Sequence, residues 1–344
     1  MIITLTANPS MDRTAVLPTE LTRGAVHRLD SVSMQAGGKG INISRAAVAA
    51  GVETIALFPA RVDDPFVTSL MADQIPVEAV LPSGSVRINL TVVEPDGTTT
   101  KLNSPGDVVD VAALDRLSEA VIRHAERATS NDWVVLAGSV PPGTPASWYS
   151  ELVVTLRRTP VRVAIDTSDA PLQALVDALP HSAPDLIKPN GAELASLTGA
   201  DPEVLEADPA SVARAARALV DRGIGAVLAT LGANGAVLVT NQGAWHATPP
   251  PVTVVSTVGA GDSSLFGYLY GRERNLSPAD SLASAVAYGS AAASLPGTTI
   301  PSPSQTHPEL SHVCELSGVR VLPGETGLTN WSANWSTEHR FCVA

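Results

Sequence analysis

Short apolar runs recur along the chain and alternate with amphipathic stretches. Each run is long enough for one buried strand, and the clearest cover residues 2–5, 133–136, 161–165, 185–187 and 226–230. Strands that alternate with helices are typical of a parallel sheet with helices on both of its faces. The pattern therefore predicts an α/β fold with a mostly parallel central sheet.

The stretches between these runs carry helix signals. Apolar residues recur at helical spacing over 111–121, and alanine-rich sequence fills 41–50 and 282–295. Asp208-Pro209 supplies an N-cap and a first-turn proline for a helix that ends near residue 223. A further helix is expected to begin at about Asp262.

Two early stretches, at about 11–36 and 84–104, interrupt this alternation with strand-like sequence. Within the second, residues 86–93 and 98–102 flank Glu-Pro-Asp-Gly and predict a hairpin. We expect the two stretches to pair as a small separate sheet, a lid over the main one. No repeat or linker divides the chain, so one domain over 1–323 is expected, with a C-terminal tail over 324–344.

Composition then excludes several classes of protein. The 344 residues include 22 Lys and Arg against 34 Asp and Glu, a net charge of −12, which argues against a general nucleic-acid or anionic-membrane binder. It does not exclude a phosphate ligand, which needs only a few local donors. Cys314 and Cys342 belong to no zinc-binding pattern and receive no role. The sequence carries no signal peptide and no run suited to a membrane helix, so a cytoplasmic protein is expected.

The most informative segment, residues 256–266, contains Gly259-Ala260-Gly261-Asp262 just before a predicted helix. Small residues let the backbone approach an anion, and amides at a helix N-terminus attract it. A carboxylate at the same end can accept a proton from a hydroxyl. The combination suits phosphoryl transfer to an alcohol, although on this segment alone a glycine-rich turn with Asp262 as a helix cap is favoured.

A second glycine-rich segment, Gly37-Gly38-Lys39-Gly40-Ile41-Asn42, precedes another predicted helix. Its lysine and amide could hold a phosphate and sugar hydroxyls, whereas the alternative is a flexible turn with a solvated lysine. Asp12 follows the first strand, where ligands bind in open parallel sheets, and is either a sugar ligand or a turn residue.

Five further positions are weaker candidates. Arg28 and Arg87 lie in the lid stretches and could clamp a phosphate, or they could belong to a solvated sheet face. Asn190 and Glu193 share one face of a helical turn and could position hydrated Mg²⁺, or they could simply begin a helix. Ser139 follows a strand and either touches substrate or caps a turn.

Taken together and in this order, the segments resemble the ribokinase-like sugar kinases of the PfkB family, over residues 2 to about 323. The narrower resemblance, carried by residues 6–14 and 94–103, is to its 1-phosphofructokinase branch, with tagatose-6-phosphate kinases as near neighbours. The resemblance implies a three-layer α/β/α sandwich with a mostly parallel central sheet and a small β-sheet lid.

The resemblance also implies roles for individual residues. It gives Asp262 as the catalytic base and residues 259–261 as the anion hole. It implies sugar-phosphate contacts from Asp12, Arg28, Gly37, Gly38, Lys39, Asn42, Arg87 and Asn103. It implies Mg-ATP contacts from Lys188, Asn190 and Glu193, and nucleotide contacts from Thr230, Gly232, Gly235, Gly261 and Gly289.

The implied reaction converts fructose 1-phosphate and ATP to fructose 1,6-bisphosphate and ADP, with Mg²⁺ and, as a further candidate, a monovalent cation. Tagatose 6-phosphate or fructose 6-phosphate would present the same anion to the same lid. A non-catalytic sugar-phosphate-binding regulator is an alternative, disfavoured because a binder needs no base. A nicotinamide oxidoreductase is disfavoured because no dinucleotide fingerprint occurs early in the chain. A homodimer joined lid to lid is expected, because an exposed small sheet tends to be covered.

Overall fold

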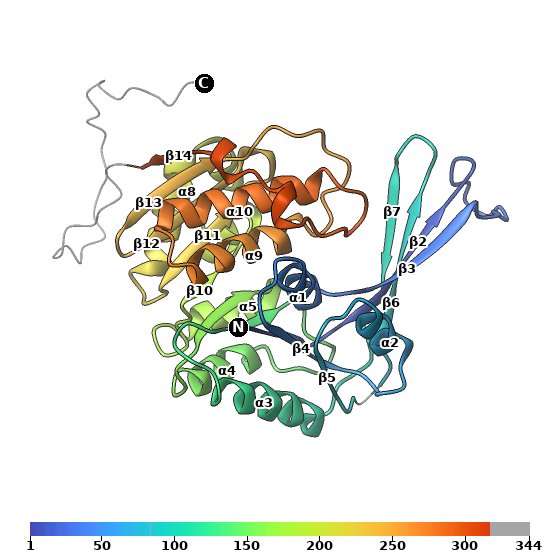
Figure 1. The fold of residues 1–344 in the computed structure, drawn as a ribbon, viewed down its shortest axis with the longest axis horizontal. Coiled ribbons are helices and arrows are strands. Elements are labelled where there is room, and N and C mark those ends of the chain that lie inside the picture. Colours follow the sequence, from blue (N-terminus) through green and yellow to red (C-terminus); the bar gives the residue numbers. More distant parts are fainter. Residues whose placement is uncertain (83, 317–344) are drawn as a thin grey trace.

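The computed structural model describes residues 1–82 and 84–316 and places a ten-stranded sheet at the centre of the body (Figure 1). The strands from β11 to β5 are parallel, and β12, β13 and β14 continue the sheet in antiparallel fashion. Across the sheet, the order is β14 (His312–Glu315), β13 (Gly243–Thr248), β12 (Ala236–Thr240), β11 (Ala226–Thr230), β10 (Leu186–Ile187), β9 (Arg162–Asp166), β8 (Trp133–Ala137), β1 (Ile2–Thr6), β4 (Thr54–Pro59) and β5 (Val77–Val80).

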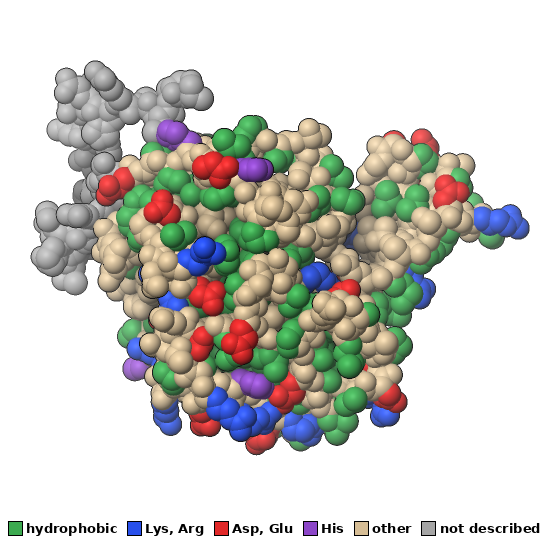
Figure 2. Space-filling model, viewed as in Figure 1, with side chains coloured by type: hydrophobic (Ala, Val, Ile, Leu, Met, Phe, Trp, Pro, Cys, Tyr) green, Lys and Arg blue, Asp and Glu red, His purple; other side chains and the backbone are tan. Residues whose placement is uncertain are grey.

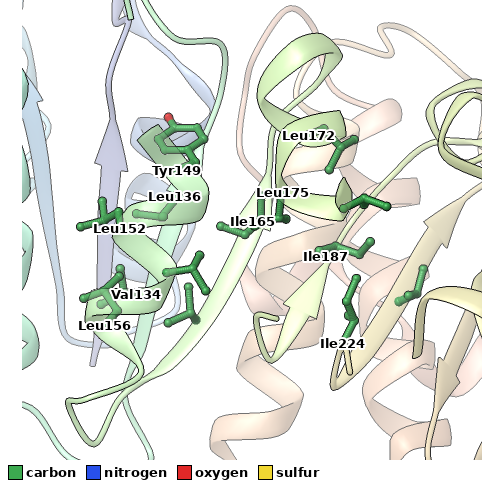
Figure 3. Packing of buried hydrophobic residues seen from close by; sticks show 14 of the residues in the cluster. Val134, Leu136, Tyr149, Leu152, Leu156, Ile165, Leu172, Leu175, Ile187 and Ile224 are labelled. Carbon is green, nitrogen blue, oxygen red and sulfur yellow. The ribbon is translucent and has the colours of Figure 1, made fainter. Parts of the chain in front are cut away.

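Helices cover both faces of this sheet, because the residues of each parallel strand alternate between two apolar layers. Ile3 of β1 packs with one set of helices, and Ile2 packs with the other. The first set, part of whose core is drawn in Figure 3, is α3 (Val111–Ala125), α4 (Trp148–Leu156), α5 (Asp169–Asp177), α6 (Gly191–Thr198), α7 (Pro202–Ala207) and α8 (Pro209–Val220). The second set is α1 (Lys39–Ala49), α9 (Ala260–Glu273) and α10 (Pro278–Ala293). The three-layer α/β/α arrangement is confirmed.

A four-stranded sheet projects from the body and confirms the expected lid (Figure 1). Its strand order is β3 (Ser31–Gly37), β2 (Ser10–Val16), β6 (Arg87–Val93) and β7 (Thr99–Asn103). Both early strand-like stretches contribute, and the hairpin around Glu-Pro-Asp-Gly joins β6 to β7. The first lid stretch is inserted between β1 and α1, so the base of the lid lies beside the carboxyl end of a central strand.

Several elements differ from the sequence pattern. The segment β4, α2 (Pro65–Ala72) and β5 was not predicted, nor were the antiparallel strands β13 and β14. Helix α10 starts four residues earlier than the alanine-rich run suggests, because the Ser277 side chain accepts a hydrogen bond from the Asp280 amide and caps it. Among the described residues, no helix is long and apolar enough to cross a membrane. The predicted tail and Cys342 lie outside the described residues, and Cys314 lies in β14.

Candidate active site

The sequence-predicted residues gather at one edge of the central sheet. Because the central strands are parallel and in register, Thr6, Ala137 and Asp166 end β1, β8 and β9 side by side. The segments after β10 and β11 reach the same edge, where Asn190 and Thr230 form an isolated bridge. Residues that are far apart in the sequence thus meet where ligands bind in open parallel sheets.

A buried carboxylate, Asp166, holds two of the predicted lysines. Its Oδ1 accepts a hydrogen bond from Lys39 Nζ at 2.7 Å, and its Oδ2 lies 3.3 Å from Lys188 Nζ. Burial alone would raise the pKa of Asp166, but the two ammonium groups outweigh it and hold the pKa below its usual range. Burial likewise opposes the charge on Lys39, yet Asp166 raises the pKa of Lys39 to about 12. Sequence reasoning missed Asp166, since an aspartate that ends an apolar strand carries no motif of its own.

The second carboxylate, Asp262, lies in the first turn of α9 with only 7% of its surface exposed. Its Oδ2 accepts a hydrogen bond from Asn42 Nδ2 at 2.8 Å. Burial and the like charge of Asp166 raise the pKa of Asp262 to about 6, against the opposing effects of Asn42 and the two lysines. A carboxylate with such a pKa is suited to accept a proton near neutral pH.

The N-terminus of α9 is left open to a ligand. Gly259 is the N-cap, with φ of 78°, and it supplies no side chain to the helix amides. In the described part of the chain, the N–H groups of Gly261 and Asp262 have no hydrogen-bond partner. Asp262 turns its carboxylate toward Asn42 instead of capping the helix, so the helix-cap alternative does not describe the structure.

Two glycines of the second segment leave no room for a side chain unless their neighbours move. Gly38 has φ of 129°, and a Cβ there would lie 2.6 Å from Thr6 Cγ2. A Cβ on Gly37 would lie 2.2 Å from Asp12 Oδ2. The segment therefore fits closely over the end of β1 and against the lid.

The lid presents a polar face and an apolar face. Gln35, Asp12, Asn89 and Asn103 are neighbours in register across its four strands, and Asp12 Oδ1 accepts hydrogen bonds from Ser10 Oγ and Asn89 Nδ2 at 2.7 and 3.0 Å. The polar row is tied to the body because Thr298 Oγ1 donates a hydrogen bond to Gln35. The opposite face carries the exposed apolar residues Val32, Met34, Ile88 and Leu102, and one exposed cation, Arg13, beside Met34.

The predicted arginines lie at different ends of the lid. Arg87 is at its base, where Nη1 donates to Ser104 O at 2.8 Å and the buried Nε has no hydrogen-bond partner within the described ranges. Arg28 is exposed in the loop beyond the far ends of β2 and β3, more than about 13 Å along the strand from Asp12. Within a single chain, Arg28 therefore does not reach the other residues predicted to contact the sugar phosphate. Ser139 is exposed near the base, with its Oγ 3.5 Å from Asn8 Nδ2.

On the other side of α9 lies a cavity of about 620 Å³, a size usual for cofactor sites. Its walls include most of the predicted nucleotide residues, namely Asn190, Thr230, Gly232, Gly235, Gly261 and Gly289. The sequence analysis missed its apolar wall, formed by Pro249, Pro250, Pro251, Val252 and Val254. No local motif marks that wall, because it is irregular chain leading into the glycine-rich loop.

Asn190 and Glu193 form a reciprocal helix cap. Their protein contacts are therefore those of two residues that begin a helix, which was one of the two alternatives for this pair. Asn190 Oδ1 accepts from the Glu193 amide and Glu193 Oε2 accepts from the Asn190 amide, both at 2.8 Å. The other carboxylate oxygen of Glu193 keeps no protein partner among residues 1–82 and 84–316. No cluster of three or more acidic, histidine or cysteine side chains forms a metal cage in these ranges. The pair therefore fits a Mg²⁺ ion that keeps its waters and is shared with phosphates, not one enclosed by protein.

Comparison with known proteins gives this geometry a family. A profile described as pfkB family carbohydrate kinase matches residues 6–305. The chain belongs to the pfkB family of carbohydrate kinases. The 1-phosphofructokinases of Rhodobacter capsulatus and Haloferax volcanii are 34% and 37% identical to this pfkB kinase, over 94% and 93% of this chain and 98% and 100% of theirs.

Solved structures place the pfkB kinase in the same fold. Phosphofructokinase-2 from Escherichia coli, in complex with substrates and products, superposes with a TM-score of 0.79 at 30% identity, covering 88% of this chain and 96% of that one. The same enzyme has been solved with fructose-6-phosphate and in a tetrameric inhibited form. The expected family, fold and enzyme class, a phosphotransferase with an alcohol acceptor, are thereby confirmed.

Proposed function

We propose that this kinase transfers the γ-phosphoryl group of ATP to fructose 1-phosphate, giving fructose 1,6-bisphosphate and ADP. The observation that carries the proposal is the position of Asp262. It is a buried carboxylate with a raised pKa, at the open N-terminus of α9, with a large cavity on one side and the segment at the lid base on the other. The names and coverage of the 1-phosphofructokinase relatives support the choice of sugar phosphate.

In this mechanism, Asp262 accepts the proton of the 6-hydroxyl while that oxygen forms its bond to the γ-phosphorus and the bond to ADP breaks. The unpartnered amides at the start of α9 stabilise the negative charge on the transferring group. ATP occupies the 620 Å³ cavity, with its base against the proline-rich wall and its phosphates toward Gly261. The cavity lining supports this placement, because it includes an apolar wall for the base and also reaches Gly261, next to Asp262.

The sugar phosphate lies under the polar face of the lid. Asp12 and Asn103 bind sugar hydroxyls, with Gly37 and Gly38 leaving room for the ring and Ser139 at the rim. Arg87 and Lys39 bind the 1-phosphate, and the unpartnered Nε of Arg87 supports this assignment. Arg28 lies beyond the reach of the same site within one chain.

Asn190 and Glu193 would hold hydrated Mg²⁺ beside the phosphates. Lys188, which is paired with Asp166, would lie close to the same phosphates. When bound, the ion neutralises charge on the β- and γ-phosphates of the nucleotide. The single free carboxylate oxygen of Glu193 supports contact through water instead of direct coordination by several protein groups.

The protein also forms a homodimer through the apolar faces of two lids. Met34 and Leu102 lie in one cross-strand row with Leu90 and the exposed Arg13. In a single chain, Met34 and Leu102 are 52% and 58% exposed, which favours a second copy as the cover. On the face drawn in Figure 2, basic and acidic side chains are scattered among one another, which gives no support to a nucleic-acid partner there.

A coupled ADP-release assay tests the proposed reaction. With ATP and Mg²⁺, fructose 1-phosphate should give a higher kcat/KM than fructose 6-phosphate or tagatose 6-phosphate. A preference for fructose 6-phosphate, the ligand in one solved E. coli phosphofructokinase-2, would keep the phosphoryl-transfer site and change the sugar. No turnover of any of the three would overturn the proposed substrate class.

A further inference from the structure

Arg45 lies one turn beyond Asn42 on α1 and joins three elements. Its Nη1 donates to Asn42 Oδ1 at 3.1 Å. Its Nη2 donates to the backbone oxygen of Ala36 at the end of lid strand β3, at 2.9 Å, and to Asp73 Oδ2 at the end of α2, at 3.1 Å. Only 13% of the Arg45 side chain is exposed. Nothing in the proposed reaction so far uses this residue.

The hydrogen bond from Arg45 determines the orientation of the Asn42 side-chain amide. An arginine side chain has donors and no acceptor, so the Asn42 oxygen must face Arg45. The Asn42 nitrogen then faces Asp262, where it donates at 2.8 Å. Without Arg45, the amide can rotate by half a turn and place its oxygen against Asp262. That arrangement repels an ionised carboxylate and accepts a hydrogen bond from a protonated one.

We propose that Arg45 is a positioning residue, which orients the Asn42 amide so that Asp262 is held as an ionised base and which ties this orientation to the lid through Ala36. The inference rests on the proposed function, since it takes Asp262 as the base. Arg45 acts through Asn42, because its hydrogen bonds go to Asn42, Ala36 and Asp73 and none goes to Asp262.

Within the described residues, Arg45 makes no hydrogen bond or ion pair with the other charged groups that face Asp262. They are Asp166 at the end of β9, Lys39 at the start of α1 and Lys188 after β10. The hydrogen bond from Asn42 lowers the pKa of Asp262, whereas burial and Asp166 raise it. Loss of the amide donor must therefore raise the pKa of the base further.

The test is the pH dependence of kcat in Arg45→Met, which keeps an apolar side chain of similar length. We expect the acid limb of the profile to move up by about one pH unit or more, so that activity falls more at pH 6 than at pH 8. In an Asn42→Ala background, Arg45→Met should cause no further shift. Asp73→Asn is the matched control, because it breaks the ion pair of Arg45 but leaves the Asn42 contact, and its limb should stay in place.

An unchanged acid limb in Arg45→Met with a lowered melting temperature would overturn the inference and leave Arg45 a purely structural residue. If Arg45→Met does not fold, Arg45→Lys retains the ion pair with Asp73 and should show a smaller shift in the same direction. An unmoved limb in Arg45→Lys would then overturn the inference. Failure of the proposed function would show differently, as normal turnover by Asp262→Asn.

Discussion

At the scale of single residues, the site is defined by two carboxylates with opposite environments. Asp166 is paired with two ammonium groups and remains ionised, whereas Asp262 is buried beside that charge and has a raised pKa. Environments that drive the pKa values of two carboxylates apart in this way commonly distinguish the catalytic base from the charged group that supports it. The sequence marked Asp262 by its glycine-rich loop but gave no signal for Asp166 or Arg45, whose roles exist only through contacts made across the fold.

Asp262→Asn should reduce kcat by about 100-fold or more. It should not reduce stability, because the oxygen of the new amide still accepts the hydrogen bond from Asn42 and no charge remains to be buried. With the folded pKa near 6 and an unfolded value near 4, ionised Asp262 costs up to about 3 kcal/mol above pH 6. Thermal melts should show the variant at least as stable as the wild type at pH 8. A variant that melts well below the wild type would contradict this account.

That stability difference should shrink at low pH. As the pH falls from 6 toward 4, wild-type Asp262 takes up a proton in the folded state before it would in the unfolded state, so the cost of its charge disappears. Thermal melts of the variant and the wild type at pH 5 should therefore show a smaller difference than the melts at pH 8.

The activity should fall at low pH, as expected for a reaction that requires an ionised carboxylate. Because Asp262 must be ionised to accept a proton, kcat should fall as the pH drops below about 6. Phosphate monoesters also titrate near pH 6, so a second variant is needed to assign the limb. Asp166→Asn removes a like charge and frees two lysines to act on Asp262, and it should move the limb to lower pH. A limb that stays in place would assign it to the substrate.

At the scale of elements, the strand and helix pattern was largely predictable, because buried parallel strands are short apolar runs and helix starts carry caps. Asp208, for example, does cap α8. The last two strands of the sheet, β13 and β14, were not predicted. Their burial is incomplete, and the edge strand β14 pairs with β13 although the two segments are more than 60 residues apart in the sequence.

Gly37→Ala tests the close packing at the base of the lid, where the segment before α1 contacts Asp12. The new methyl group would meet Asp12 Oδ2, so the Asp12 side chain must leave its present position at the proposed sugar site. We expect the KM for the sugar phosphate to rise by about tenfold, from the loss of one or two hydrogen bonds, while the KM for ATP changes little. Gly191→Ala is the control, since its Cβ would meet only Leu231 at an ordinary 3.6 Å. Equal effects on both KM values would contradict a local role.

At the scale of the whole molecule, the two faces of the lid differ in chemistry, and we propose a different partner for each. Strand alternation puts Asp12, Asn89 and Asn103 on one face and Met34 and Leu102 on the other. The sequence predicted the lid, because the strand pattern is local. It did not place Arg28, since the position of a loop between two strands depends on how far the ribbon extends.

Leu102→Lys should weaken the dimer by placing a charge in its apolar interface. Light scattering at micromolar concentration should give a dimer for the wild type and a monomer for the variant. Val204→Lys, on the exposed surface of α7, changes an apolar residue of similar exposure away from the lid and should remain dimeric. A monomeric wild type would contradict the lid-to-lid interface.

The contact between Asn42 and Asp262 joins residues 220 positions apart, and this has a consequence for the growing chain. The lid, α1 and the central strands leave the ribosome first, and they already contain the residues proposed to bind the sugar. The base, its amides and α10 follow only after three quarters of the chain has been made. A nascent chain that stops before α9 holds the residues proposed to bind the sugar but lacks the proposed base and the helix against which α1 packs, so it cannot transfer phosphate until synthesis is nearly complete.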